Sequence, residues 1–491
     1  MADPKSRALQ SPATPVFHAG FCAERNRPFI LAAAVLTTSI GLIDGHVVAI
    51  ALPAMRDSLN ADLVQAQWIH NAYMLTLSAL ILVGGAMGDR FGLARVLGLG
   101  IGLFVLAYVF CAIAPTALFM IIARAVQGVG AAIMGPGSLA IIARAYPRES
   151  RVRAICICAA AASLTSATGP IIGGLALTFG GPDTWRWIFA INLPLGAVAL
   201  YLLFSRVGAD RRNDSTRIDL PGALCVTLAL LALAWGLTAR QEGHGAPLWL
   251  VSGVILLGLF LLIEARSSHP MIPLSLFASR AFSAANGLTF TLYAGLSIMF
   301  FFMPMTFIAG WGLSEIEASA AFAPMSVFIT LMSARAGRLA DRFGPAPLLV
   351  IGSLIVACGY GAVALRARYQ DVWGHILPAM CLVGLGMSAV VAPLSTSIMG
   401  AVDDSQSGTA SGINNAVTRL AALISIAMVG GLVAALYSSA GGTASFGVPS
   451  DSVGHAQAMT TAFAGLAWLA TGLSVLSAAL GWLTHAGGDK N

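Results

Sequence analysis

Long hydrophobic segments, separated by short polar ones, make up most of this 491-residue sequence. Each is long enough to cross the hydrocarbon core of a bilayer, about 30 Å thick, as an α-helix. The pattern predicts fourteen spans, at 29–52, 66–88, 93–114, 117–143, 152–178, 187–207, 219–239, 247–265, 282–310, 315–336, 346–366, 375–400, 408–437 and 457–485. The expected fold class is therefore an all-α polytopic membrane protein.

Composition supports this class. Hydrophobic residues make up 57% of the chain and charged residues only 10%, whereas soluble domains are roughly a quarter charged. The net charge of +6 comes almost entirely from arginines in short loops, where orientation signals of membrane proteins are found. We therefore expect the lipid bilayer as a partner and no nucleic acid. The seven cysteines form no Cys-x-x-Cys pair and are expected to be small core residues.

The basic residues predict the orientation. Twenty lysines and arginines lie in the tails and in the loops on the N-terminal side of the spans, and five arginines lie in the opposite loops. Because cytoplasmic loops carry the excess of basic residues, we expect both termini to be cytoplasmic. The Ala- and Arg-rich composition favours a bacterial origin, so the expected location is the bacterial plasma (inner) membrane.

The tetrapeptide Asp-Arg-Phe-Gly occurs after the second span, at 89–92, and again after the tenth, at 341–344. Many transporters consist of two parallel repeats. With six spans in each half, the second copy would follow span eight, so its position predicts two inserted helices. The resulting organisation is a tail at 1–28, a six-helix half at 29–207, a linker at 208–218, two inserted helices at 219–265, a linker at 266–281, a second six-helix half at 282–485 and a tail at 486–491.

Several motifs then indicate a family. Gly85, Asp89, Arg90 and Gly92 resemble the loop signature of the major facilitator superfamily, and the second copy repeats it with Gly337, Asp341, Arg342 and Gly344. The segments "IDGHVVAIALP" (43–53), "RAVQGVGAA" (124–132) and "GPIIGG" (169–174) resemble motifs of its fourteen-helix drug:proton antiporters, although His46, Ala49 and Thr165 depart from the usual pattern. The resemblance implies a 6+2+6 fold and proton-driven antiport that exports small amphipathic or lipophilic compounds such as drugs, antibiotics and dyes.

The residues of the duplicated loops suit a contact between helices. An aspartate at a helix end can accept backbone N–H groups from the start of another helix, where the helix dipole favours negative charge. In the resembled family this loop joins the two halves on the cytoplasmic side. We therefore expect Asp89 to meet the start of span thirteen, near 408–411, and Asp341 to meet span five. The alternative is that both motifs are solvated turns.

Asp44 is the only acidic residue well inside a predicted span. A charge at mid-membrane costs about 2.5–3.5 kcal/mol on insertion scales and therefore marks an ion path or a partner. Since removal from water disfavours the charged carboxylate, Asp44 is the candidate proton carrier, with Arg124 as its candidate partner in proton coupling. The alternatives are a structural aspartate and an arginine that reaches out to the membrane rim.

Gly169, Pro170, Gly173 and Gly174 of span five resemble the antiporter motif of that family. They would provide a bend and a surface of small residues that packs closely on a neighbouring helix. Such a contact between the halves would close a leak path, while the alternative is ordinary tight packing.

Polar and aromatic residues inside apolar spans are candidates for a substrate cavity, although a tyrosine can also be an interfacial anchor. His46 is an additional candidate, as a pocket residue or a proton relay. The full set is His46, Asn71, Tyr73, Gln127, Asn192, Asn286, Tyr293, Asn414, Asn415 and Arg419.

No Gly-x4-Gly-Lys-Ser/Thr loop and no His-Glu-x-x-His motif occurs, so we expect neither a primary pump nor an enzyme. The expected partners are a small-molecule substrate, lipid and protons, with a transmembrane proton gradient in place of any cofactor and with a monomer as the working unit. Three functions stay open: an exporter of many compounds, a dedicated exporter or importer of a single metabolite, and a receptor that does not transport.

Overall fold

The computed structural model describes residues 23–207, 219–239, 246–267, 270–402 and 406–484, and at a few helical positions, including His46 and Asp89, it describes the backbone alone. Within these residues the chain forms helices and no strand. The main helices are α1 (Arg27–Ser58), α2 (Leu63–Phe91), α3 (Leu93–Ala112), α4 (Ala117–Ala145), α5 (Arg148–Gly180), α6 (Trp185–Arg206), α7 (Leu220–Ala239), α8 (Ala246–Arg266), α9 (Arg280–Met305), α10 (Glu315–Ala320), α11 (Ala323–Phe343), α12 (Pro345–Arg366), α13 (Leu377–Gly400), α14 (Ser407–Ser439) and α15 (His455–Leu483).

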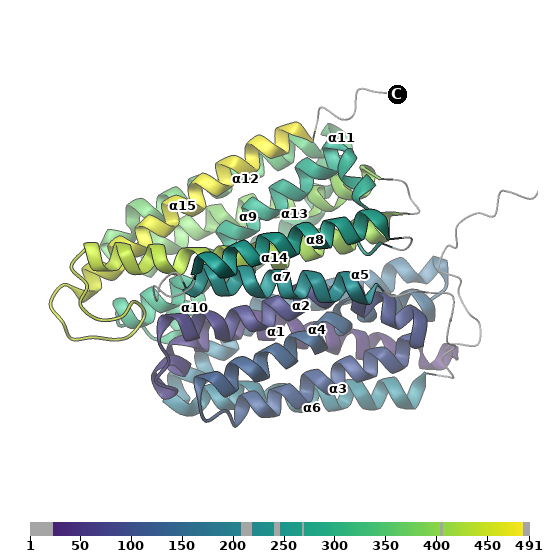
Figure 1. The fold of residues 1–491 in the computed structure, drawn as a ribbon, viewed down its shortest axis with the longest axis horizontal. Coiled ribbons are helices and arrows are strands. Elements are labelled where there is room, and N and C mark those ends of the chain that lie inside the picture. Colours follow the sequence, from purple (N-terminus) through teal and green to yellow (C-terminus); the bar gives the residue numbers. More distant parts are fainter. Residues whose placement is uncertain (1–22, 208–218, 240–245, 268–269, 403–405, 485–491) are drawn as a thin grey trace, which may run out of the picture.

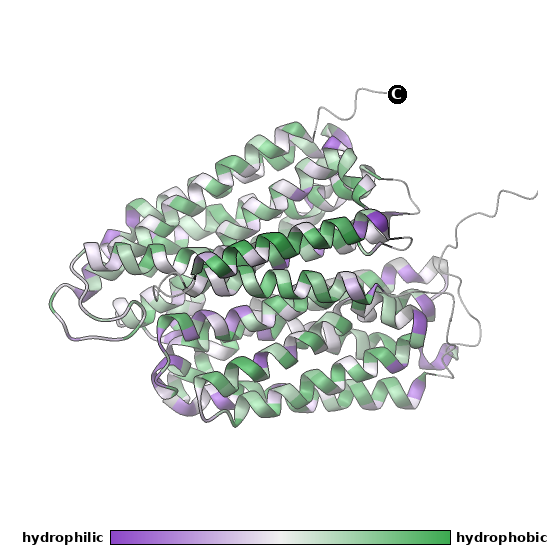
Figure 2. Cartoon of the chain, viewed as in Figure 1, coloured by the Kyte–Doolittle hydropathy of each residue, from purple (hydrophilic) through white to green (hydrophobic). Residues whose placement is uncertain are grey.

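The helices correspond one by one to the fourteen predicted spans. Thirteen segments of the described chain are long and apolar enough to cross a membrane, with α10 and α11 together forming one of them. The fourteenth is α5, which has 33 residues and carries no charged residue between Arg153 and its end at Gly180. Strongly hydrophilic residues lie mostly at the helix ends, and the middle of the bundle is mostly hydrophobic (Figure 2). The predicted fold class is confirmed.

The helices form two groups. Helices α1–α6 pack among themselves, and α9–α15 form the second group (Figure 1). Helices α7 and α8 pair with each other as a hairpin, and α7 also contacts α2 of the first group and α14 of the second. The hairpin therefore lies across the boundary between the two groups, as Figure 1 shows.

The duplicated tetrapeptide forms the same turn twice. Helix α2 ends at Phe91 and α11 ends at Phe343, and the next residue is a glycine with positive φ, 102° at Gly92 and 81° at Gly344. Glycine adopts positive φ without steric cost, which explains its place in both copies. We call the side of the bundle with these turns the motif end. The segment between α14 and α15 projects from the opposite end (left in Figure 1).

Candidate functional site

Asp44 of α1 is buried and forms a hydrogen-bonded ion pair with Arg124 of α4. The Arg124 Nη1 atom lies 2.8 Å from both carboxylate oxygens of Asp44. Gln127 completes the group: its Nε2 donates to Asp44 at 2.8 Å, and its Oε1 accepts from Arg124 at 2.6 Å. The side chains of the charged pair are 0% and 1% exposed. The structure thus brings together the two residues that the sequence proposes for proton coupling.

Helix α2 holds this group in place. The Nε atom of Arg124 donates to the carbonyl of Ile69 at 3.2 Å, and its guanidinium lies 4.3 Å from the centre of the Tyr73 ring. The close approach of α2 and α4 depends on Gly128, where a side chain would collide with the backbone of Tyr73 and the hydroxyl of Thr76. Buried ion pairs are stable only when further hydrogen bonds satisfy the remaining donors and acceptors, and the arrangement meets that requirement.

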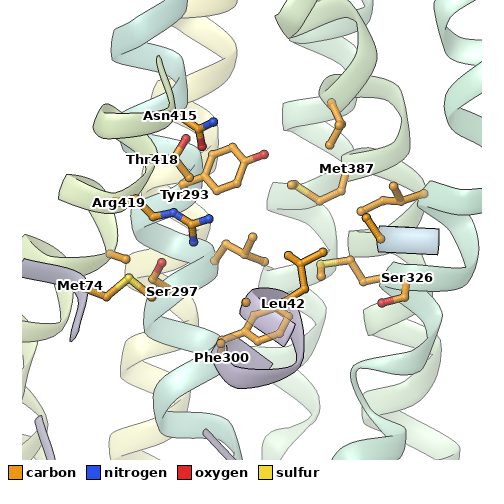
Figure 3. A pocket seen from close by; sticks show the side chains of 18 of the residues that line it. Leu42, Met74, Tyr293, Ser297, Phe300, Ser326, Met387, Asn415, Thr418 and Arg419 are labelled. Atoms are coloured by element: carbon orange, nitrogen blue, oxygen red, sulfur yellow. The ribbon is translucent and has the colours of Figure 1, made fainter. Parts of the chain in front are cut away.

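A central cavity lies between the two groups of helices. It has two chambers of about 550 and 720 Å³, and both include Leu42, Ser411, Asn415 and Arg419 in their walls. In Figure 3, Arg419, Tyr293 and Asn415 lie on one side of the first chamber, and Met387 and Ser326 lie on the other. Volumes of 300–1,000 Å³ are usual for sites that bind drug-sized molecules.

The second chamber extends toward the motif end. Its walls include Gly85 of the first loop motif, Ile81 one turn earlier on α2, and Pro136 of α4. Gly41 borders both chambers, and Gly45 borders the first; both are close neighbours of Asp44 on α1. Because these two positions carry no side chain, the backbone of α1 borders the cavity next to Asp44.

At the opposite end, contacts between the two groups close the bundle. Arg56 of α1 is 1% exposed and donates to the carbonyl of Phe446, which lies in the segment between α14 and α15, at 2.5 Å. Gln67 of α2 donates to the carbonyl of Ile426 on α14 at 2.8 Å. Because these donors meet backbone carbonyls of the other group, sliding of one group past the other would break the bonds.

Helix α5 contributes to the same closure. Thr178 donates to Glu315 at 3.1 Å and accepts from the backbone N–H of Ile316 at 3.2 Å. Gly174 faces α10 so closely that a Cβ there would lie 2.8 Å from the carbonyl oxygen of Glu315. Gly173 faces Val47 of α1 in the same way, at 2.7 Å. Gly169 and Pro170 are buried in the preceding turn. A gating role for the motif stays a prediction.

Five of the predicted cavity residues border the cavity: Tyr73, Tyr293, Asn414, Asn415 and Arg419. Four others do not, which corrects the expectation. Gln127 belongs to the ion-pair group, Asn192 donates to the Tyr108 hydroxyl at 3.1 Å, and Asn286 donates to the carbonyl of Phe282 and accepts from Asn414. Asn71 is fully buried away from both chambers. The side chains of Gln127, Asn192 and Asn286 thus bond to residues of neighbouring helices, while neither polar atom of the Asn71 amide has a hydrogen-bond partner among the described residues. The side chain of His46 lies outside the described part of the structure.

The sequence predicts that the duplicated loops join the two halves, and the structure describes only part of these loops. The side chain of Asp89 lies outside the described part of the structure. Arg90 lies over the Phe91 ring at 5.3 Å, and Arg342 lies over Phe343 at 5.1 Å. Asp341 is exposed and forms no ion pair with any described side chain. The role of these loops stays a prediction.

Sequence reasoning missed most of the apolar lining of the first chamber and one polar group, His70. Methionines and phenylalanines form much of the first chamber, namely Met74, Phe300, Phe301, Met325 and Met387. His70 also lines it, with its ring at 5.6 Å from that of Phe301. His70 could have been predicted as a cavity residue, because it is a polar residue inside an apolar span. The apolar residues did not, because lipid-facing and cavity-facing methionines look alike in sequence.

Many known proteins are similar in sequence to this multi-pass helical membrane protein. Residues 29–426 and 285–485 match the family described as Major Facilitator Superfamily. The chain is 32% identical to the methylenomycin A resistance protein of Bacillus subtilis over 411 residues, which cover 81% of this chain and 86% of that protein. It is 31% identical to the lincomycin resistance protein of Streptomyces lincolnensis over 390 residues (79% and 80%) and 30% identical to the puromycin resistance protein of Streptomyces alboniger over 467 residues (92% and 90%).

Solved structures agree on the fold. A bacterial homologue of the human lysosomal transporter Spinster, in an inward-facing and unoccupied conformation, superposes with a TM-score of 0.67 at 17% identity and covers 95% of this chain and 98% of its own. The POT-family transporter PepTSo gives a TM-score of 0.67 at 15% identity and covers 94% of this chain and 98% of its own. The chain belongs to the Major Facilitator Superfamily, and it is a transporter of small molecules rather than an enzyme.

Proposed function

We propose that the protein is a secondary active transporter that exports small amphipathic or lipophilic compounds in exchange for protons. The observation that carries this proposal is the Asp44–Arg124 ion pair, buried beside a cavity of drug-binding size. The resistance proteins among its relatives favour antibiotics and related compounds as cargo.

The proton step rests on Asp44. Its carboxylate accepts from Arg124 and Gln127 while the cavity reaches toward the motif end. A proton on Asp44 removes the negative charge that holds the guanidinium and weakens the contact of α1 with α4. Such a change shifts the equilibrium between two conformations of the protein only if the two conformations bind the proton with different affinities. We propose that this difference couples proton entry to opening of the opposite end.

The finer assignments belong to the same proposal. The bias of basic residues supports cytoplasmic termini in the bacterial inner membrane, so the motif end would be the cytoplasmic end. The two groups of helices support the division into halves at 29–207 and 282–485, with 219–265 inserted between them and 208–218 and 266–281 as linkers. The proposed working unit is the monomer.

The test uses everted membrane vesicles, in which export appears as uptake of a fluorescent compound. A panel of lipophilic dyes of different charge is offered with an acidic vesicle interior, and the gradient is then collapsed with an ionophore. We expect uptake of at least some dyes to stop on collapse in the natural protein and to be lost in Asp44→Asn. Uptake that ignores the gradient would contradict proton coupling, and uptake of one compound alone would favour a dedicated metabolite exporter.

A further inference from the structure

Arg419 of α14 is the only charged residue among the described side chains that line the central cavity. Its Nε–H group is buried without a hydrogen-bond partner, and it forms no ion pair with a described residue. In Figure 3 its guanidinium lies between Met74 and Tyr293, on the wall that also carries Asn415. The guanidinium is thus a donor group that faces the cavity.

No acidic residue is available to balance it. Asp44 is the only acidic residue well inside a span, and both of its oxygens are already engaged by Arg124. The cavity walls contain no aspartate or glutamate among their described residues. The interior therefore has one cation in excess, which water can solvate only while the cavity is open.

We propose that Arg419 binds an acidic group of the substrate, and that the preferred cargo is a lipophilic anion, such as a carboxylic acid or a phenolate. This inference rests on the proposed transport function and specifies the substrate class of the same cavity. The planar guanidinium matches a carboxylate with two parallel hydrogen bonds. When the cavity closes around a substrate and excludes water, an anion would compensate the charge of Arg419, whereas a cation would add to it.

The other walls suit the apolar part of such a molecule. Met74, Met325, Met387 and Phe300 border the same chamber, and methionine is flexible enough to fit ligands of different shape. Tyr293 and His70 add polar groups near the arginine; the Nε2 atom of His70 is buried without a hydrogen-bond partner. The chamber thus combines one cationic point with an adaptable apolar surface.

The test compares two xanthene dyes of opposite charge, fluorescein and rhodamine 6G. Their binding to the purified full-length protein in lipid nanodiscs is measured by fluorescence anisotropy at mildly alkaline pH, with empty nanodiscs as the blank. We expect fluorescein to bind more tightly than rhodamine 6G. Arg419→Gln should weaken fluorescein binding about tenfold to a hundredfold, the value of a charge-assisted hydrogen bond, and should not weaken rhodamine binding. Arg419→Lys should retain part of the preference.

Ser297→Ala is the matched control, because Ser297 lines the same chamber without a charge. It should leave the ratio of the two affinities unchanged. Rhodamine 6G binding as tightly as fluorescein, or an equal loss of both dyes in Arg419→Gln, would overturn the inference. Because binding is measured without a gradient, a protein that prefers the anion but fails to transport it would contradict the proposed function and leave the inference standing.

A second, independent observation concerns two carboxyl groups at the motif end of the inserted hairpin. Asp219 directly precedes α7, and Glu264, 2% exposed, lies in the last turn of α8. One oxygen of each is engaged: Asp219 accepts from the N–H of Gly222 at 2.8 Å, and Glu264 accepts from the N–H of Ile272 at 3.0 Å. The second oxygen of each is buried and has no hydrogen-bond partner.

These two free oxygens converge on Gly222. A Cβ at that position would lie 2.7 Å from Asp219 Oδ2 and 3.1 Å from Glu264 Oε1. The charged groups nearby do not neutralise them. Helix α7 has no other charged residue, and α8 adds only Arg266, which is exposed. Of the helices packed against α7, α2 contributes Arg90, which lies beside Phe91, and α14 contributes Arg419 in the central cavity. Further along the chain, Arg280 begins α9. Arg217, His269 and the Asp89 side chain lie outside the described structure.

We infer that Glu264 keeps a proton and shares it with the free oxygen of Asp219. Two neighbouring carboxylates cannot both stay ionised away from water, and one shared proton satisfies both free oxygens. The Glu264–Ile272 bond joins the hairpin to the segment that leads into the second half. This site lies outside the central cavity and is separate from the Asp44 step.

Thermal unfolding of the purified protein, followed from pH 6 to 9, tests this assignment. Glu264→Gln mimics the protonated group, since its amide can donate to Asp219 and accept from Ile272. We expect the unaltered protein to lose stability relative to this variant as the pH rises, with the same trend for Asp219→Asn. Glu24→Gln, at an exposed carboxyl, should follow the unaltered protein. A constant difference at every pH, or stabilisation of the unaltered protein by added sodium or potassium at alkaline pH, would contradict a shared proton.

Discussion

Replacing Arg124 by methionine gives the sharpest test of the buried ion pair. The substitution keeps most of the side-chain volume but removes the donors that contact both oxygens of Asp44 at 2.8 Å. Gln127 then remains as the neutral partner of a carboxylate whose side chain is 0% exposed. Breaking a buried pair in this way costs about 3–5 kcal/mol.

That cost falls if Asp44 takes up a proton. The folded variant then binds one more proton than its unfolded chain, so its stability decreases by about 1.4 kcal/mol for each pH unit above the point where unfolded aspartates ionise, until the buried carboxyl loses its proton. We therefore expect the stability gap between Arg124→Met and the unaltered protein to widen from mildly acidic to alkaline pH.

Thermal unfolding in detergent micelles, followed by intrinsic fluorescence at several pH values, measures this gap. The double variant Asp44→Asn/Arg124→Met is the control, because it removes both charges and should recover much of the loss and all of the added pH dependence. An Arg124→Met protein as stable as the natural one, or equally less stable at every pH, would refute the reasoning.

Three further substitutions test the opposite end. Gly174→Val should prevent close packing of α5 on α10, because even a Cβ lies 2.8 Å from the carbonyl of Glu315; we expect transport to be lost while the protein stays folded, as checked by vesicle uptake and size-exclusion chromatography. Arg56→Gln should free the segment around Phe446, since it removes the 2.5 Å bond, and hydrogen exchange there should increase. The pKa of Asp371 is lowered by the N–H of Gly374 and by the ring of His375, so its stabilising contribution is present above the usual carboxyl pKa and lost as the pH falls below it; Asp371→Ala should lower the unfolding temperature at neutral pH and less so in acid.

Much of the fold follows from the sequence because lipid permits few alternatives. Backbone groups in the bilayer must be satisfied internally, so each apolar segment becomes a helix. The tetrapeptide Asp-Arg-Phe-Gly marked two equivalent turns, since its glycine at 92 and 344 has positive φ in both. The pairing of Asp44 with Arg124 was also accessible, because few other charges lie inside the spans.

The remaining site residues depend on tertiary contacts that local sequence does not contain. Gln127 and Asn192 are polar residues in apolar helices, as are Asn414 and Asn415, yet the first two satisfy other side chains and the last two face the cavity. The difference lies in how each helix is rotated against its neighbours. Arg56 was expected in a loop, but it is buried because a segment 390 residues later in the chain folds over it.

Transport by the purified protein in liposomes tests the central claim most directly, with two modes compared in the natural protein and in Asp44→Asn. In the first mode a pH gradient drives accumulation of a substrate; in the second, labelled and unlabelled substrate exchange across the membrane without a gradient. We predict that Asp44→Asn loses accumulation but retains exchange. Gradient-driven accumulation that persists in Asp44→Asn would contradict the assignment of Asp44 as the proton carrier.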